Sequence, residues 1–303
     1  MTQFRAQFDA TITFLNGGGL QTQGFLLDVR SEQVEDTDLA LALVRHLGLL
    51  MVEDVSVSNV RVVPAAHRGS RGTGGPAASP GRLIDLSHVI REGMVTYPGL
   101  PGPEFRPYLS REDSKAVYAD GTQFTIDRIS MLGNTGTYLD SPHHRYDGGT
   151  DLAGLHLEQL ADLPISVGRL DGSTSRGIAA AALAALDVAG RAVLLQTGWD
   201  RHFGTEAYAG PAPYLTEDGA RYLVEHGAAL VGIDSVNIDD TAPTSGGRRP
   251  AHSLLLAAGI PVLEHLTALA DVPADGARLH AVPPKVAGFG TFPVRAYAVV
   301  RPD

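Results

Sequence analysis

The sequence predicts an α/β fold for most of the chain, preceded by a small α+β module. The chain has 303 residues, enough for one or two domains. Residues 66–81 are rich in Gly, Ser, Pro and Ala and contain no large apolar side chain, which is typical of a linker. Beyond them, apolar segments of strand length alternate with capped helices, as in α/β domains. We therefore expect a module over 1–65, a linker over 66–81 and a larger domain over 82–303.

The first module is expected to combine a β-hairpin with one helix. Residues 10–14 alternate between apolar and polar side chains, and a glycine turn separates them from a second strand over 22–29. A helix is predicted from Asp36 to Gly48, because acidic caps precede leucines that recur at every fourth position. One or two more strands are expected in 55–62. Since this module contains no cluster of reactive side chains, we expect it to serve packing or assembly.

The larger domain is predicted to alternate strands with helices. One helix is expected over 216–226, with Thr216 as its cap and Gly227 as its end. Apolar segments predict strands at 192–197, 228–233, 260–264 and 294–300. This order of elements favours an α/β or mixed β/α domain.

The composition excludes several kinds of site and partner. The chain contains no cysteine, which rules out disulfides, thiolate metal sites and a cysteine nucleophile. Its net charge of -10 has the wrong sign for nucleic-acid binding. No stretch of about 18 apolar residues predicts a membrane span, so we expect a soluble cytoplasmic protein. As its partner we expect a small-molecule substrate. With eleven histidines, any metal site must use imidazole and oxygen donors.

Reactive side chains gather in two segments of the larger domain. Residues 133–146 combine small residues, a proline and several polar side chains, which favours a functional loop. Asp140 and His144 lie four positions apart there, so a carboxylate can orient an imidazole or share a metal with it. Further along, His252 opens a short apolar helix and Glu264 ends a short apolar strand. Spacing alone leaves open that these four residues are turn caps or solvated surface groups.

The stretch Asn134–His144 resembles the signature of the cyclase family of metal-dependent hydrolases, which reads His-x-Gly-Thr-His-x-Asp-x-Pro-x-His. That family includes bacterial kynurenine formamidase and isatin hydrolase. The resemblance implies a swivelling β/β/α fold and a homodimer or larger homo-oligomer, and it does not cover residues 1–81. Further matching motifs follow in order across 82–303: Leu83 to His88, Tyr97 to Gly99, Gln196 to Trp199, Gly232 to Ser235, His252 to Glu264, Pro283 to Lys285 and Pro293 to Ala296.

The resemblance also implies roles for individual residues. In the family, the two early histidines and the aspartate of the signature bind a divalent metal, commonly Zn or Mn, together with a later histidine and glutamate. The last histidine of the signature is the general acid/base. Position by position, Asp140 matches the aspartate ligand, His144 the acid/base, and His252 with Glu264 the later pair.

Two expected metal ligands are replaced in this chain. Asn134 and Tyr138 stand where the family has its first and second histidines. The remaining donors are Asp140, His252 and Glu264, with the Asn134 carbonyl oxygen as a further candidate. Because zinc favours imidazole and thiolate, and a phenol with a pKa near 10 is a reluctant ligand, we expect no catalytic metal. A site for Mn or Zn built on these donors is the alternative.

Three functions are consistent with these residues. In the favoured one, His144 moves protons beside Asp140 or Glu264, while Tyr138 and Asn134 donate hydrogen bonds to the oxygen of an amide, lactam, lactone or cyclisable ketone. The first alternative is a divalent-metal-dependent amide or lactone hydrolase of the arylformamidase type. The second is a ligand-binding protein without catalysis.

Overall fold

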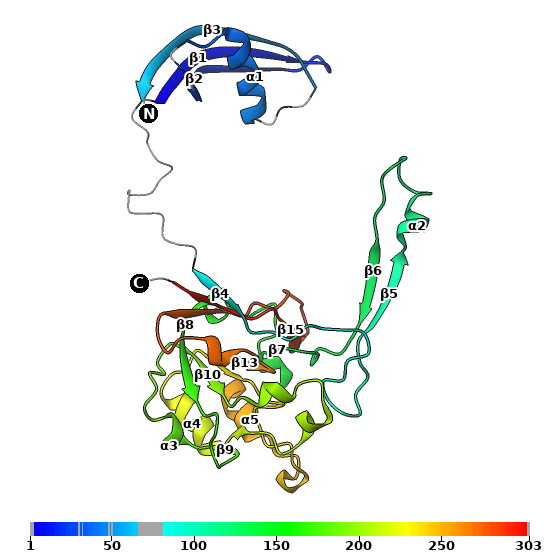
Figure 1. Cartoon of the computed structure of the whole chain (residues 1–303), viewed down its shortest axis with the longest axis vertical. Helices are drawn as coiled ribbons and strands as arrows, with labels where there is room; N and C mark the ends of the chain where they lie inside the picture. The colour runs from blue at the N-terminus through cyan, green and yellow to red at the C-terminus, as the bar shows by residue number, and fades with distance from the viewer. Residues whose placement is uncertain are drawn as a thin grey trace. The chain divides into compact units, whose positions relative to one another are not determined.

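The computed structural model describes residues 3–29, 31, 33–47, 49, 51–65 and 81–301. These belong to two compact units, which divide between residues 78 and 79 (Figure 1). The expected linker over 66–81 lies outside the described residues except for Gly81, and so does Gly48, the expected helix end. In the part of the chain that the structure describes, no helix is long and apolar enough to cross a membrane.

The first unit is a three-stranded antiparallel sheet with one helix. Strand β1 (Gln3–Phe14) lies between β2 (Gly19–Val29) and β3 (Val52–Ala65), and α1 (Asp36–Leu47) connects β2 to β3. The predicted hairpin and helix are therefore present, while the expected short strands in 55–62 form one long strand. Alternate side chains of β1 are buried with two leucines of α1, as a sheet with one covered face requires: Ala6, Phe8, Ala10, Ile12, Leu39 and Leu43.

The second unit is built on a nine-stranded mixed sheet in the order β15-β7-β13-β12-β10-β8-β14-β16-β4. Its middle strands β8, β10, β12 and β13 run parallel, and the outer strands pair antiparallel. The strands are β4 (Arg82–Asp85), β7 (Tyr138–Asp140), β8 (Ala161–Arg169), β10 (Ala192–Gln196), β12 (Leu230–Ile233), β13 (Val262–Glu264), β14 (Ala277–His280), β15 (Thr291–Pro293) and β16 (Tyr297–Val300).

Short helices cover one face of this sheet. They are α3 (Ala180–Leu183), α4 (Glu217–Glu225) and α5 (Pro250–Ala257). The Thr216 hydroxyl caps α4 by accepting from the Gly219 amide, as predicted. Every residue of β10 and β12 is buried, because apolar layers lie on both sides of the parallel strands.

Smaller elements connect these layers. Strands β9 (Gly177–Ile178) and β11 (Tyr214–Leu215) form a parallel pair. Single 3-10 turns occupy Pro142–His144, Leu157–Gln159, Trp199–His202, Glu206–Ala209, Pro243–Ser245 and Leu269–Asp271.

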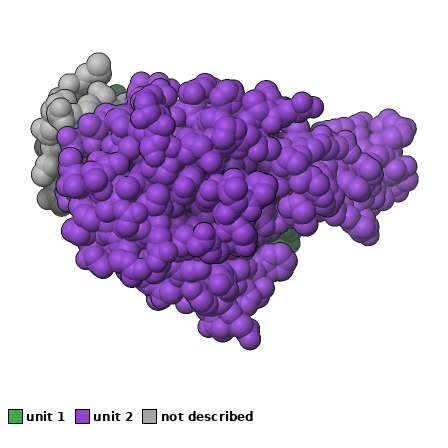
Figure 2. All heavy atoms as spheres, turned by 90° about the horizontal axis from the view of Figure 1, so that it is seen from below, with its two compact units in different colours: residues 1–78 green, residues 79–303 purple. Residues whose placement is uncertain are grey.

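A two-stranded arm projects from the second unit (Figures 1 and 2). It consists of β5 (Glu104–Leu109) and β6 (Ile126–Ser130), with α2 (Arg111–Ser114) near its tip. All residues of β6 are exposed. A two-stranded ribbon with exposed apolar side chains is marginally stable on its own, and its exposed residues include Tyr108, Phe124, Ile126 and Ile129.

The α/β architecture and most predicted elements of the larger domain are confirmed. Two predictions were wrong in detail. The expected loop over 133–146 contains the buried strand β7, which pairs with β13 on one side and β15 on the other. The strand expected over 294–300 begins only at Tyr297, since the chain leaves β15 at Pro293 before β16 starts.

Candidate active site

The predicted site residues meet around one cavity of about 320 Å³. Tyr138 and Glu264 face each other across the paired strands β7 and β13, which explains how residues far apart in sequence become neighbours. His144 follows in the 3-10 turn after β7, and His252 lies in the first turn of α5. Asp140 is fully buried behind the cavity wall. The lining residues are Tyr97, Leu100, Asn134, Tyr138, His144, Arg145, Asn237, Arg249, His252 and Glu264.

The hydrogen bonds of Thr291 determine which nitrogen of His144 carries the proton. The Thr291 hydroxyl donates its only proton to Oδ1 of Asp140. The Oγ1 atom of Thr291 also lies 2.6 Å from Nδ1 of His144. Because the hydroxyl proton is already used, Nδ1–H of His144 must be the donor in this second contact. In the neutral ring, this contact leaves the lone pair of His144 on Nε2. Its side chain is 35% exposed, and the residue lines the cavity. This is the arrangement of a general base held in one tautomer by a hydroxyl and a carboxylate behind it.

His252 lies among three carboxylates. Its Nδ1 is 2.7 Å from Oδ2 of Asp239. The Asp239 carboxylate also accepts hydrogen bonds from the backbone amides of Ala251 and His252, and it therefore caps the first turn of α5. Its Nε2 is 3.4 Å from Asp140 and 3.6 Å from Glu264. Burial lowers the pKa of His252, but these carboxylates outweigh it and raise the pKa to about 10.

Glu264 is held by a network of hydroxyl and amide groups. The Tyr138 hydroxyl donates to Oε2 of Glu264, and the backbone amide of Ile238 donates to Oε1 at 2.5 Å. The Asn237 amide lies 3.3 Å from Oε2. Burial raises the pKa of Glu264 to about 7, against the lowering effect of His252. Burial also places the pKa of Tyr138 well above its ordinary value, so its phenol stays protonated as a donor.

A second layer of buried groups supports Tyr97. The Tyr97 hydroxyl is 2.6 Å from the Tyr138 hydroxyl and donates to the Val236 carbonyl at 2.7 Å. His265 lies 3.1 Å from Tyr97 through Nε2 and 2.7 Å from Tyr208 through Nδ1. Burial lowers the pKa of His265 to about 3, so the ring is neutral. His265 adopts a left-handed backbone with φ of 53°, a conformation that is uncommon for residues other than glycine.

Several donors of the site are arranged as a divalent ion requires. Oδ2 of Asp140 is buried without a hydrogen-bond partner among the described residues, and Nε2 of His252 faces it. Ligand atoms of Asp140, His144 and His252 lie within 4.8 Å of one another. Asp239 at Nδ1 orients His252 as a carboxylate commonly orients a metal-binding imidazole. These donors fit a divalent ion. This group of three possible ligands includes His144 and leaves out Glu264, which the sequence had suggested. Both carboxylate oxygens of Glu264 already accept hydrogen bonds from the protein.

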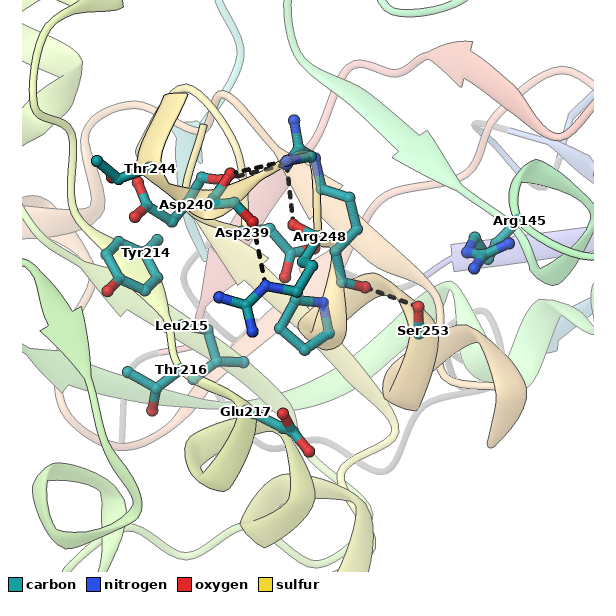
Figure 3. Close-up of a pocket in the computed structure, with 14 residues that line it drawn as sticks. Arg145, Tyr214, Leu215, Thr216, Glu217, Asp239, Asp240, Thr244, Arg248 and Ser253 are labelled. Atoms are coloured by element: carbon teal, nitrogen blue, oxygen red, sulfur yellow. Dashed lines mark hydrogen bonds between the residues drawn. The ribbon is translucent and has the colours of Figure 1, made fainter. Parts of the chain in front are cut away.

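A larger outer cavity of about 700 Å³ surrounds the start of α5 (Figure 3). It shares Arg145 and Arg249 with the inner cavity, so these two arginines stand at the junction. Arg145 lies at one side of the outer cavity and Tyr214 with Thr216 at the other.

Several residues of the site were not predicted from the sequence. Thr291 had no local signal at all. Tyr97 lies in the Tyr-Pro-Gly motif that carried part of the resemblance, but nothing there indicated its hydroxyl contacts. Asn237 and Asp239 belong to a polar run directly after β12, a position where side chains often line sites at the carboxyl ends of parallel strands.

Comparisons with known proteins identify the family. A family model described as "Putative cyclase" matches residues 84–240. A kynurenine formamidase of Bacillus cereus is 29% identical over 224 residues, covering 72% of this chain and 97% of that protein. A kynurenine formamidase of Geobacillus thermodenitrificans is 29% identical over 215 residues, covering 70% and 95%.

Solved structures share the fold of the second unit. An isatin hydrolase bound to the product analogue thioisatinate is 26% identical with a TM-score of 0.62, covering 73% of this chain and 92% of that one. A potential metal-dependent hydrolase with cyclase activity is 27% identical with a TM-score of 0.59, covering 73% and 99%. The fold implied by the resemblance is thus confirmed, and this chain belongs to the cyclase family of hydrolases.

Proposed function

We propose that the protein hydrolyses an amide, lactam or lactone carbonyl by general acid/base catalysis at His144. The observation that carries this proposal is the fixed tautomer of His144, with Nδ1–H directed at Thr291 and a free Nε2 on the cavity wall. The curated relatives are formamidases, and a structural relative is an isatin hydrolase; both names describe cleavage of a carbonyl–nitrogen bond.

His144 moves the proton in both halves of the reaction. Its Nε2 takes a proton from water while the water oxygen bonds to the carbonyl carbon, and the resulting imidazolium keeps its Nδ1–H bond to Thr291. Asp140, behind Thr291, stabilises that positive charge. The C–N or C–O bond then breaks as Nε2–H protonates the leaving nitrogen or oxygen. The products are a carboxylic acid and an amine or alcohol, or one ring-opened acid.

Asn134 is the proposed donor to the carbonyl oxygen. Its amide lines the cavity and has no hydrogen-bond partner among the residues that the structure describes. The Tyr138 hydroxyl, expected from the sequence to serve with it, directs its proton to Glu264. We therefore assign Tyr138 to holding Glu264 in place. Because Asn134 and Tyr138 replace two imidazole ligands of the family signature, we propose that the reaction runs without a catalytic metal.

The fit of the donors favours one second candidate, a divalent-metal-dependent hydrolase. Asp140, His252 and His144 would hold Mn or Zn, with Glu264 and Asn134 nearby. A bound ion would polarise the carbonyl and lower the pKa of a water molecule. His144 would then be a ligand instead of the free base.

The two candidates differ in metal content and in response to a chelator. The purified full chain is assayed with formanilide and isatin after metal analysis, with and without EDTA, beside a His144→Ala variant. Turnover that persists in EDTA and is lost in His144→Ala supports the metal-free mechanism. Stoichiometric Zn or Mn, with activity lost on chelation and restored by the metal, would overturn it. Tight binding of these compounds without turnover would instead support a ligand-binding protein.

The homodimer expected from the resemblance remains a proposal. Its support is the projecting arm, whose strand β6 exposes Ile126 and Ile129 and gains little burial from the chain's own residues. Light scattering on the full chain gives its mass in solution, and a monomer at micromolar concentration would contradict the proposal. The cytoplasmic location and the assembly role of residues 1–65 also stay predictions.

A further inference from the structure

We propose that the substrate carries a carboxylate, and that Arg145 and Arg249 bind it at the junction of the two cavities. This inference rests on the proposed function for the position of the reacting carbonyl, which lies at His144 in the inner cavity. It adds the substrate's charge and the two residues that select for it.

The position of the two arginines makes them suitable for this role. Arg145 directly follows His144, and Arg249 directly precedes α5, which carries His252. Both line the inner and the outer cavity. A group held between them therefore lies within one small molecule's length of the proposed base. The inner cavity of about 320 Å³ is large enough for a single aromatic ring with its substituents.

The charges around the junction leave positive charge unpaired. Among the described residues, neither arginine has a carboxylate within ion-pair distance. Arg145 lies over the Tyr146 ring at 5.3 Å, and Arg249 donates to the carbonyls of Asp240 and Arg248. An acidic protein with two unpaired guanidinium groups on a cavity wall attracts an anion there.

The acidic residues of the outer cavity do not cancel this charge. Glu217 pairs with Arg221 and Asp240 with Arg176, while Asp239 shares His252 with Asp140 and Glu264. Against this one partly balanced carboxylate, the cavity wall carries the guanidinium groups of Arg145 and Arg249. The cavity also contains Arg248, which donates only to the Ser245 carbonyl. The uncompensated charge on these walls is therefore positive.

The donors at the junction match a carboxylate better than a phosphate. Phosphate groups commonly bind the free amides at a helix start. At the start of α5 the amides of Ala251 and His252 are already taken by Asp239. The guanidinium group of Arg145 donates to no acceptor among the described residues, and that of Arg249 uses only Nη1 on protein carbonyls. Their remaining N–H groups can pair with a carboxylate through parallel hydrogen bonds.

A matched pair of substrates tests the inference. Formanilide and N-formylanthranilate share an aryl formamide, and only the second carries a carboxylate. We expect the wild-type kcat/KM to be at least about tenfold higher for N-formylanthranilate. In Arg145→Met and Arg249→Met, the ratio of the two kcat/KM values should fall about tenfold, as for one lost charge-assisted hydrogen bond. Arg201→Met is the control, because Arg201 is exposed, pairs with Asp171 and lines neither cavity.

The outcomes separate this inference from the proposed function. A ratio near one in the wild type, or a ratio that neither substitution changes, would overturn the carboxylate site even if both compounds are hydrolysed. If neither compound is hydrolysed, the proposed function fails, and calorimetry of N-formylanthranilate with His144→Ala decides the inference. Binding weakened about tenfold by adding Arg249→Met, and unchanged by adding Arg201→Met, supports the site. No binding, or binding that is unchanged by Arg249→Met, overturns it.

Discussion

Replacing Thr291 by valine tests whether the hydroxyl between Asp140 and His144 directs catalysis. Valine keeps the shape of threonine and removes the oxygen that donates to Asp140 and accepts from His144. Oδ2 of Asp140 already has no hydrogen-bond partner among the described residues. The variant would thus leave both oxygens of a fully buried carboxylate without a hydroxyl or amide donor.

Two effects of different size follow from this loss. A hydrogen bond to a charged buried group contributes about 1.5–3 kcal/mol, so the free energy of unfolding of Thr291→Val should fall by about that amount. His144 also loses its anchor at Nδ1, and a partly exposed ring can then rotate away from the cavity. Because misplacing a reacting group by about 1 Å costs roughly a hundredfold, kcat should fall by about that factor.

The assay compares Thr291→Val with Thr291→Ser. Serine keeps the hydroxyl, so we expect its kcat to stay within a fewfold of the wild type. Denaturant unfolding of both variants measures stability separately from turnover of formanilide or isatin. A folded Thr291→Val with kcat within threefold of the wild type would refute the assignment of His144 as a base oriented by Thr291.

Three further predictions concern buried residues of the second unit. Tyr138→Phe should lower turnover by about ten- to a hundredfold. It should also raise the pKa of Glu264 further, because that carboxyl loses a hydrogen bond that favours its charged form. An unchanged pH–rate profile would contradict this. Asp239→Asn should lower Tm by about 4 °C or more and reduce kcat, since the start of α5 and His252 share that carboxylate; calorimetry and turnover check it. Burial lowers the pKa of His88 to about 4, so the folded state disfavours its protonation and loses stability as pH falls from about 6.5 towards 4. His88→Phe should therefore raise Tm more at pH 5 than at pH 7.5, and equal changes at both values would oppose this.

The sequence by itself determined several of the elements and part of the chemical groups of the site. Apolar runs predicted strands such as β10 and β12, and the cap at Thr216 predicted α4, because these signals are local in the chain. The same holds for the replaced histidines. Asn134 and Tyr138 were visible as departures from the family signature, since a motif is a property of consecutive residues.

The tertiary structure decided how those groups are connected. Strand β7 is only three residues long, and it forms because β13 and β15 provide hydrogen bonds on both sides. That pairing places Tyr138 on Glu264 and brings Thr291 between Asp140 and His144. Residues more than a hundred positions apart meet only through the register of the sheet, which no local pattern encodes. The direction of the proton on His144, and with it the proposed mechanism, follows from that register.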